Sequence, residues 1–146
     1  MIKFISKSAY DTELLGQKIA AVLNGCEMIA LFGDLGAGKT AFTRGLCRGL
    51  DIVDDVSSPT FAIVNSYRGK TPVYHFDMYR ISGIDDLYST GFYDYIGTGV
   101  IVIEWSENIE QELEDDAIRI TITKTDNENE RIFEIEGLDD YADTIC

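Results

Sequence analysis

The residues of this chain best suited to chemistry lie in the stretch GDLGAGKT, which runs from Gly33 to Thr40. It satisfies the pattern G-x-x-x-x-G-K-[S/T], in which glycines allow successive main-chain N–H groups to point at one anion. In this pattern the lysine, here Lys39, reaches the β- and γ-phosphates of a nucleotide, and the hydroxyl of Thr40 is a ligand for Mg²⁺. An apolar run precedes the stretch and a helical pattern follows it, so the sequence predicts a phosphate-binding loop between a strand and a helix.

Two acidic residues stand where apolar segments end. Asp77 closes VYHFD and Glu104 closes VIVIE. In open α/β sheets the carboxyl ends of the strands line the binding crevice, and a magnesium ion held by one threonine needs further oxygen ligands. We expect at least one of these acids to bind magnesium or to orient water. The alternative is that they cap strands or face solvent.

Three further residues have weaker claims to a role. Thr60 lies in SSPTF, Ser57 to Phe61, where nucleotide-hydrolysing proteins place a switch loop, although it is equally compatible with an ordinary threonine that opens a strand. His75 alternates with apolar neighbours and is predicted to be a core histidine. Trp105 follows an acid, and it either packs in the core or stacks against a base or a partner.

The elements that must position these residues alternate between buried strands and amphipathic helices. Strands are predicted at IKFI (2–5), MIALF (28–32), FAIVNSY (61–67), VYHFDMY (73–79), GVIVIEW (99–105), AIRITIT (117–123) and RIFEIEG (131–137). Helices are predicted at DTELLGQKIAAVLNG (11–25), ended by Gly25, at 39–50 and around 85–89.

The remaining segments are predicted to be irregular. DIVDDVSSPTF (51–61) is a loop, GFYDYIG (91–97) is an aromatic loop, and the tail 138–146 is frayed or weakly helical. Together the elements indicate an α/β layered fold with a mixed sheet, ending in a β-hairpin with one solvated face. With no repeat or linker, residues 1–146 are expected to form one domain.

The charge balance limits which partners the chain binds directly. Acidic residues outnumber basic residues 26 to 12, which gives a formal net charge of −14, whereas a protein that grips a phosphate backbone needs a basic stripe. We therefore expect no direct, stable nucleic-acid binding. Arg44 and Arg48 share one helix face, which indicates a solvated stripe or, alternatively, a docking surface.

Other sequence features indicate a cytoplasmic protein without membrane contact. The longest apolar runs are far shorter than the roughly 20 residues of a membrane-spanning helix, and the N-terminus lacks the pattern of a signal peptide. Cys26, Cys47 and Cys146 form no CxxC pair, so neither a zinc site nor a disulfide framework is predicted.

The order and spacing of these motifs are similar to those of the TsaE (YjeE) family, small ATPases of bacterial threonylcarbamoyladenosine synthesis on tRNA. GDLGAGKT, SSPTF, VYHFDMYR and VIVIEW follow one another as in that family, over about residues 12–108. The resemblance implies a P-loop NTPase-like fold of three α/β/α layers, binding of ATP with Mg²⁺, and slow hydrolysis by the isolated protein. It also implies action on a TsaB–TsaD pair, in which TsaD modifies adenosine 37 of certain tRNAs and ATP resets the complex between turnovers.

The resemblance further implies roles for individual residues. Lys39, Asp77 and Glu104 are expected to take part in catalysis, and Thr40, Asp77 and Glu104 to bind Mg²⁺. Thr12 would lie near the adenine, and Arg131 would contact the nucleotide from the hairpin. The full set of expected ATP contacts is Thr12, Gly33, Leu35, Gly36, Ala37, Gly38, Lys39, Thr40, Ala41, Thr60 and Arg131.

Two other functions also use a phosphate-binding loop. A small-molecule or nucleotide kinase needs an arginine-rich lid, and here six arginines are spread along the chain with no long insertion. A binding module would use the nucleotide only to change its affinity for a partner. GTP remains an alternative to ATP, because phosphate binding requires no base-reading signature.

Overall fold

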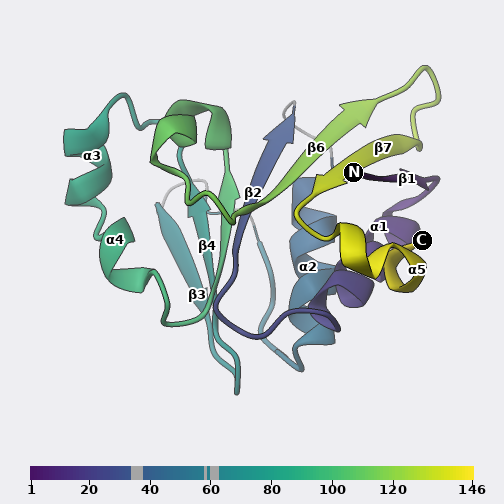
Figure 1. Ribbon diagram of the computed structural model, residues 1–146, viewed down its shortest axis with the longest axis horizontal. Helices are drawn as coiled ribbons and strands as arrows, with labels where there is room; N and C mark the ends of the chain where they lie inside the picture. Colours follow the sequence, from purple (N-terminus) through teal and green to yellow (C-terminus); the bar gives the residue numbers. More distant parts are fainter. Residues whose placement is uncertain (34–37, 58, 60–62) are drawn as a thin grey trace.

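Within residues 1–33, 38–57, 59 and 63–146, which the computed structural model describes, seven strands form one mixed sheet (Figure 1). The strands are β1 (Ile2–Ser6), β2 (Met28–Gly33), β3 (Val64–Tyr67), β4 (Val73–Asp77), β5 (Val100–Glu104), β6 (Ile118–Lys124) and β7 (Arg131–Glu136). Their order along the sheet is β1-β7-β6-β2-β5-β4-β3. The central strands β6, β2, β5 and β4 are parallel, and the strands at both edges are antiparallel.

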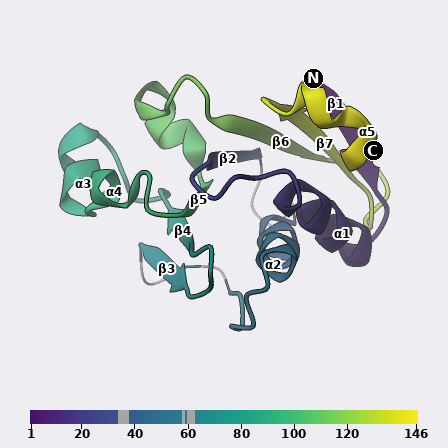
Figure 2. The same cartoon turned by 60° about the horizontal axis from the view of Figure 1, so that its bottom comes forward.

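Helices cover both faces of this sheet. On one face lie α1 (Ala9–Ala20), α2 (Lys39–Gly49) and the C-terminal α5 (Ala142–Ile145). On the other face lie α3 (Ile84–Ser89), α4 (Phe92–Tyr95) and the 3₁₀ helix η1 (Ser106–Glu112), while η2 (Asp139–Tyr141) leads into α5. Figure 2 shows α1 and α2 packed side by side and well separated from α3 and α4. The predicted α/β layered fold with a mixed sheet is confirmed.

The central strands are buried on both faces because their sequences are continuously apolar. All five residues of β5 are buried, as are the first four of β2. The hairpin of β6 and β7 instead alternates, with Ile120 and Ile122 buried and Thr121 and Thr123 exposed. The prediction of a C-terminal hairpin with one solvated face is therefore confirmed.

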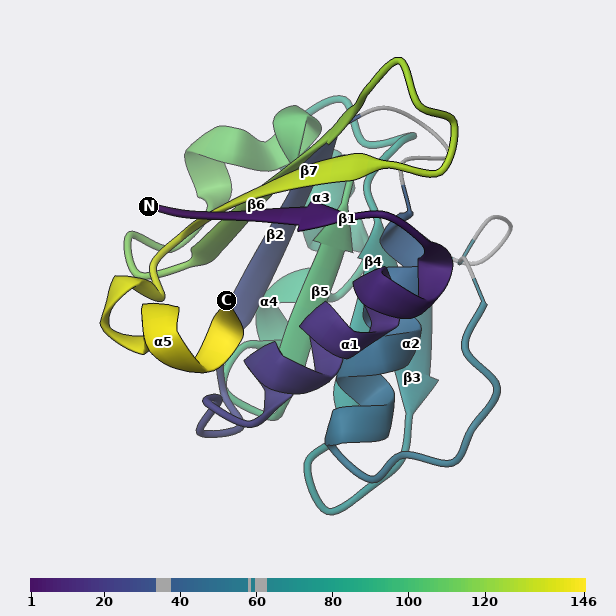
Figure 3. The ribbon, with the colours of Figure 1, turned by 90° about the vertical axis from the view of Figure 1, so that its right-hand side faces the viewer.

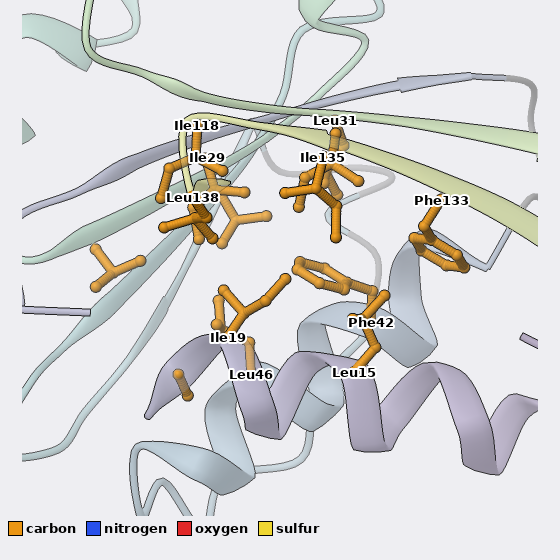
Figure 4. Close-up of a cluster of buried hydrophobic side chains, with 14 of the residues drawn as sticks. Leu15, Ile19, Ile29, Leu31, Phe42, Leu46, Ile118, Phe133, Ile135 and Leu138 are labelled. Carbon is orange, nitrogen blue, oxygen red and sulfur yellow. The ribbon is translucent and has the colours of Figure 1, made fainter. Parts of the chain in front are cut away.

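The core between the sheet and the helices α1 and α2 is aliphatic with two phenylalanines, and each large side chain that it buries contributes about 1.5–3 kcal/mol. Figure 4 shows side chains of both helices pointing at the sheet. The labelled residues are Leu15, Ile19, Ile29, Leu31, Phe42, Leu46, Ile118, Phe133, Ile135 and Leu138.

The close approach of α1 and α2 requires glycine at their crossing. A Cβ built on Gly45 would overlap the backbone of Glu13, and one built on Gly16 would overlap the backbone of Phe42. This approach fixes the start of α2, which carries Lys39, against α1, which carries Thr12.

Helix α1 both begins and ends earlier than predicted. It starts at Ala9 and not at Asp11. Ser8 caps it by accepting a hydrogen bond from the Asp11 N–H at 3.0 Å. The helix ends at Ala20, so the prediction that it continues to Gly25 is wrong. The carboxylate of Glu27 accepts hydrogen bonds from three consecutive main-chain N–H groups at 24–26, which holds this segment in a turn.

Several other segments also test the prediction. The aromatic loop 91–97 contains α4, because Phe92 is fully buried and its ring lies 5.2 Å from that of Phe76. The predicted strand 73–79 ends at Asp77 as β4, the described part of 61–67 forms β3 from Val64, residues 61 and 62 lie outside the described residues, and no helix was predicted for η1. Of the two alternatives predicted for the tail, the weakly helical one is confirmed by η2 and α5, and the fully buried Ile145 anchors it. Figure 3 shows this tail beside α1.

Among the described residues, no helix is both long enough and apolar enough to cross a membrane.

Candidate functional site

The segment predicted to bind phosphates is preceded by β2 and followed by α2, the strand and the helix that the sequence predicted around it. Gly33 and Gly38, which border it, have φ values of +135° and +98°, a region that favours glycine. The Gly33 N–H donates to Glu107 Oε2 at 3.2 Å, which ties the loop to η1. Leu35, Gly36 and Ala37 lie outside the described residues.

Lys39 is the first residue of α2, and it is almost completely buried, with 4% of its surface exposed. Its Nζ has no hydrogen-bond partner in the described part of the chain. The ammonium lies 5.1 Å from the centroid of the Trp105 ring, a cation–π contact. Buried charges are normally paired, so this site is suited to an anion.

Thr40 and Ala41 follow in the first turn of α2 and are half-buried. The first four N–H groups of a helix have no partner within it, and they lie at the positive end of the helix dipole. The structure therefore places the N–H groups of this turn, the Thr40 hydroxyl and the Lys39 ammonium at one end of α2.

Asp77 and Glu104 end the neighbouring parallel strands β4 and β5 and are direct partners in the register. Glu104 is 7% exposed, whereas Asp77 is half-buried. Burial raises the pKa of Asp77, and the negative charge of Glu104 raises it further. The Tyr79 N–H, which donates to Asp77 Oδ1 at 2.9 Å, acts in the opposite direction, as does the charge of Lys39. Two adjacent carboxylates with this mutual repulsion are suited to a cation.

His75 lies one residue before Phe76 and two before Asp77 on β4, and it is fully buried, as predicted for a core histidine. Its Nε2 lies 2.5 Å from Glu104 Oε2. The contact is not aligned as a hydrogen bond, and neither ring nitrogen has a hydrogen-bond partner within the described residues. The sequence did not predict the contact with Glu104.

Trp105 follows Glu104 in the left-handed region, with φ of 58°, an unusual conformation for a bulky residue. Its ring lies 4.9 Å from that of Tyr79. It therefore packs against neighbouring side chains and lines the side of the site next to Lys39, and stacking against a base or a partner stays a prediction.

Polar residues of η1 hold this end of the sheet together, and the sequence analysis missed them. Asn108 Nδ2 donates to the carbonyls of Met78 and Tyr79 at 2.8 and 3.2 Å, and the Met78 N–H donates to the Glu104 carbonyl at 3.0 Å. Ser106 Oγ donates to the Ile103 carbonyl at 3.1 Å. The signal that could have identified them is the polar run SEN directly after a buried strand.

Thr12 lies close to the start of α2. Its Cγ2 would be 3.9 Å from a Cβ built on Gly38, and its Oγ1 is 2.7 Å from Ser6 Oγ. Arg131 opens β7 opposite Ser6, and its Nη1 donates to the carbonyls of Glu128 and Glu130. The structure thus brings Thr12 to the loop and holds Arg131 within its own hairpin. Thr60 lies outside the described residues.

The donors of this site fit a magnesium–nucleotide complex. Oxygen ligands come from Asp77, Glu104 and Thr40, and hard oxygen donors are what Mg²⁺ binds. Among the described residues, no group of three or more His, Cys, Asp or Glu side chains is arranged to hold a metal ion. Two carboxylates and one hydroxyl are therefore suited to a metal that arrives with the phosphates, which supply further oxygen ligands.

Comparison with known proteins agrees with this geometry. Residues 6–133 match the family model described as "Threonylcarbamoyl adenosine biosynthesis protein TsaE". The chain is 37% identical to the tRNA threonylcarbamoyladenosine biosynthesis protein TsaE of Treponema pallidum, over 83% of this chain and 90% of the relative. It is also 37% identical to that of Bacillus subtilis, over 93% and 87%. The crystal structure of Bacillus subtilis YdiB superposes with a TM-score of 0.71 at 34% identity, covering 90% of this chain and 82% of the other.

Proposed function

This chain belongs to the TsaE family of threonylcarbamoyladenosine biosynthesis proteins, and on that premise we propose that it is the Mg²⁺-dependent ATPase subunit of this tRNA modification. It acts on a TsaB–TsaD complex that modifies adenosine 37, and it does so in the cytoplasm. The observation that carries the proposal is the buried ammonium of Lys39 at the start of α2, whose charge acts on Asp77, the neighbour of Glu104 in the sheet.

The residues of the site divide into two groups by charge. Lys39 and the N–H groups at the start of α2 bind the β- and γ-phosphates, because they offer positive charge and unpaired donors. The Thr40 hydroxyl and the carboxylates of Asp77 and Glu104 hold Mg²⁺, which neutralises charge that develops on the phosphates. Asp77 and Glu104 also lie where one of them can orient the attacking water.

Three arginines of the chain are engaged away from the loop, which supports slow hydrolysis of ATP by the isolated protein. Arg44 and Arg48 both pair with Glu13 of α1, at 3.2 and 3.0 Å, and Arg131 is bound to carbonyls of its own hairpin. Phosphoryl transfer in related sites gains 10³–10⁵-fold from an arginine that faces the γ-phosphate. We infer that binding to TsaB–TsaD completes the site.

The test measures free phosphate released from ATP by the purified protein, with and without TsaB–TsaD. We expect slow release by the protein alone, faster release with both partners, and none from Lys39→Ala. Lys70→Ala, which changes an exposed lysine, is the matched control and behaves as the wild type. Full-speed hydrolysis that ignores TsaB–TsaD would contradict the proposal, and phosphate found on an acceptor would identify a kinase.

A further inference from the structure

The polar side chain of His75 lies deeper in the sheet than the carboxylates of Asp77 and Glu104 and has aliphatic neighbours on β4 and β5. Val73, His75 and Asp77 alternate on β4 and point to the same face as their register partners on β5. Those partners are Val100, Val102 and Glu104. The three valines are fully buried, so this face accepts aliphatic side chains well.

A histidine at this depth therefore needs an explanation other than packing. Its ring is fully buried, and both nitrogens have no hydrogen-bond partner among the described residues. A buried polar group without a partner destabilises the fold. The polar atom that the ring does approach is Glu104 Oε2, at 2.5 Å from Nε2.

We propose that His75 is a positioning residue for Glu104. The close approach of its Nε2 to Oε2 keeps that carboxylate oxygen at the floor of the site and leaves Oε1 to bind the Mg²⁺ of the nucleotide complex. This inference rests on the proposed function.

The contact is suited to this task for two reasons. The polar edge of an imidazole ring is suited to facing a carboxylate oxygen. The ring is locked by burial on a central strand, so it fixes the rotamer of Glu104 better than a flexible side chain would. In metal sites the partners of ligating side chains typically contribute 10–100-fold to metal affinity.

The experiment compares wild type with His75→Leu, which fills the space without a polar atom, and His75→Gln, which keeps an N–H near the position of Nε2. A non-hydrolysable ATP analogue is titrated by calorimetry with and without Mg²⁺. The quantity compared is the factor by which Mg²⁺ tightens binding. We expect His75→Leu to reduce this factor about 10-fold and to leave the affinity for the metal-free analogue unchanged. We expect His75→Gln to restore part of the lost factor.

Val73→Ala is the matched control, because it truncates a buried residue on the same strand and face but away from Glu104. It lowers the unfolding temperature and leaves the Mg²⁺ factor unchanged. His75→Leu, which removes unpartnered polar atoms, does not lower the unfolding temperature. If His75→Leu does unfold the protein, the same comparison is made with His75→Asn, which lacks a donor at the Nε2 position.

The inference is overturned if His75→Leu or its replacement keeps the full Mg²⁺ factor, or if metal-free affinity falls as much as affinity with Mg²⁺. It is also overturned if His75→Gln loses as much as His75→Leu. A wild-type protein that does not bind the analogue, or binds it without any effect of Mg²⁺, contradicts the proposed function instead.

Discussion

Two groups of buried polar side chains in this protein differ in how they are hydrogen-bonded. Where β1 leads into α1, Ser6 Oγ and Thr12 Oγ1 lie 2.7 Å apart, and each also lies within hydrogen-bonding distance of a main-chain carbonyl. At the ends of β4 and β5, the polar atoms of Lys39 Nζ, the His75 ring and Glu104 Oε2 have no hydrogen-bond partner among the described residues.

The difference separates stability from function. Native proteins pair nearly all of their buried polar groups, so a pair such as Ser6 and Thr12 contributes to folding. An unpaired cluster lowers stability, and it persists where a ligand supplies the missing partners. Lys39 and Glu104 have opposite charges, as a site for both phosphate and metal requires.

The largest effect is expected from Lys39→Met, which replaces the buried ammonium by an apolar side chain of similar length. ATP affinity falls by about 2–5 kcal/mol, because a desolvated charge pair is lost. Stability without ATP rises, because an unpaired buried charge costs more than the roughly 0.5–2 kcal/mol of its cation–π contact with Trp105. Calorimetric titration and thermal unfolding measure the two effects.

A loss of stability in ligand-free Lys39→Met would break the comparison, since it would mean that the ammonium stabilises the fold. Lys70→Met, at an exposed position, is the control and changes neither quantity.

A smaller effect of opposite sign is expected from Thr12→Val in the paired group. It removes the hydrogen bond with Ser6 and lowers the free energy of unfolding by about 0.5–1.5 kcal/mol. Thermal unfolding without nucleotide measures the change. Thr121→Val, on the exposed face of β6, is the matched control and stays within about 0.5 kcal/mol of the wild type. An unchanged or more stable Thr12→Val would show that pairing does not distinguish the two groups.

The smallest effect concerns Cys47, which is buried between α2 and the core. Burial raises the pKa of its thiol to about 12, with a smaller contribution from Asp54. Because this folded-state pKa exceeds the ordinary value of 9.0, the contribution of Cys47 to stability is fully present below about pH 9 and is lost as the pH rises from there toward about 12. At pH 8, stability is therefore unaffected and Cys47 does not react.

Alkylation at pH 8 followed by intact-mass measurement checks this. The native protein takes up two labels, at the exposed Cys26 and Cys146, and the unfolded protein takes up three. If the native protein took up a third label as fast as the two at the exposed cysteines, the core beside α2 would open readily. Cys47 would then be reached by local unfolding.

Sequence patterns predicted the parts of the site that depend on local order. The glycine loop, the strand before it, the helix after it and the carboxylates that end β4 and β5 all follow from short-range periodicity. Their meeting at one edge follows from the rule that parallel strands present their carboxyl ends together.

Features that depend on long-range contacts were not predictable in this way. Asn108 holds Met78 and Tyr79 across about thirty residues of chain, and β1 pairs with β7 from opposite ends of the sequence. The C-terminal boundary of α1 was not predicted because the main-chain N–H groups of residues 24–26 donate hydrogen bonds to the carboxylate of Glu27, which follows them in the chain. The contact of His75 with Glu104 depends on the β4–β5 register, which the sequence does not specify.

The measurement that tests the central claim most directly is a calorimetric titration of the wild-type protein with ATP, with and without Mg²⁺, alongside Glu104→Gln. The account predicts one ATP per chain, bound more tightly with Mg²⁺, and a variant that binds metal-free ATP normally but loses most of the gain from Mg²⁺. Absence of ATP binding by the wild type, or a gain from Mg²⁺ that Glu104→Gln leaves intact, would contradict it.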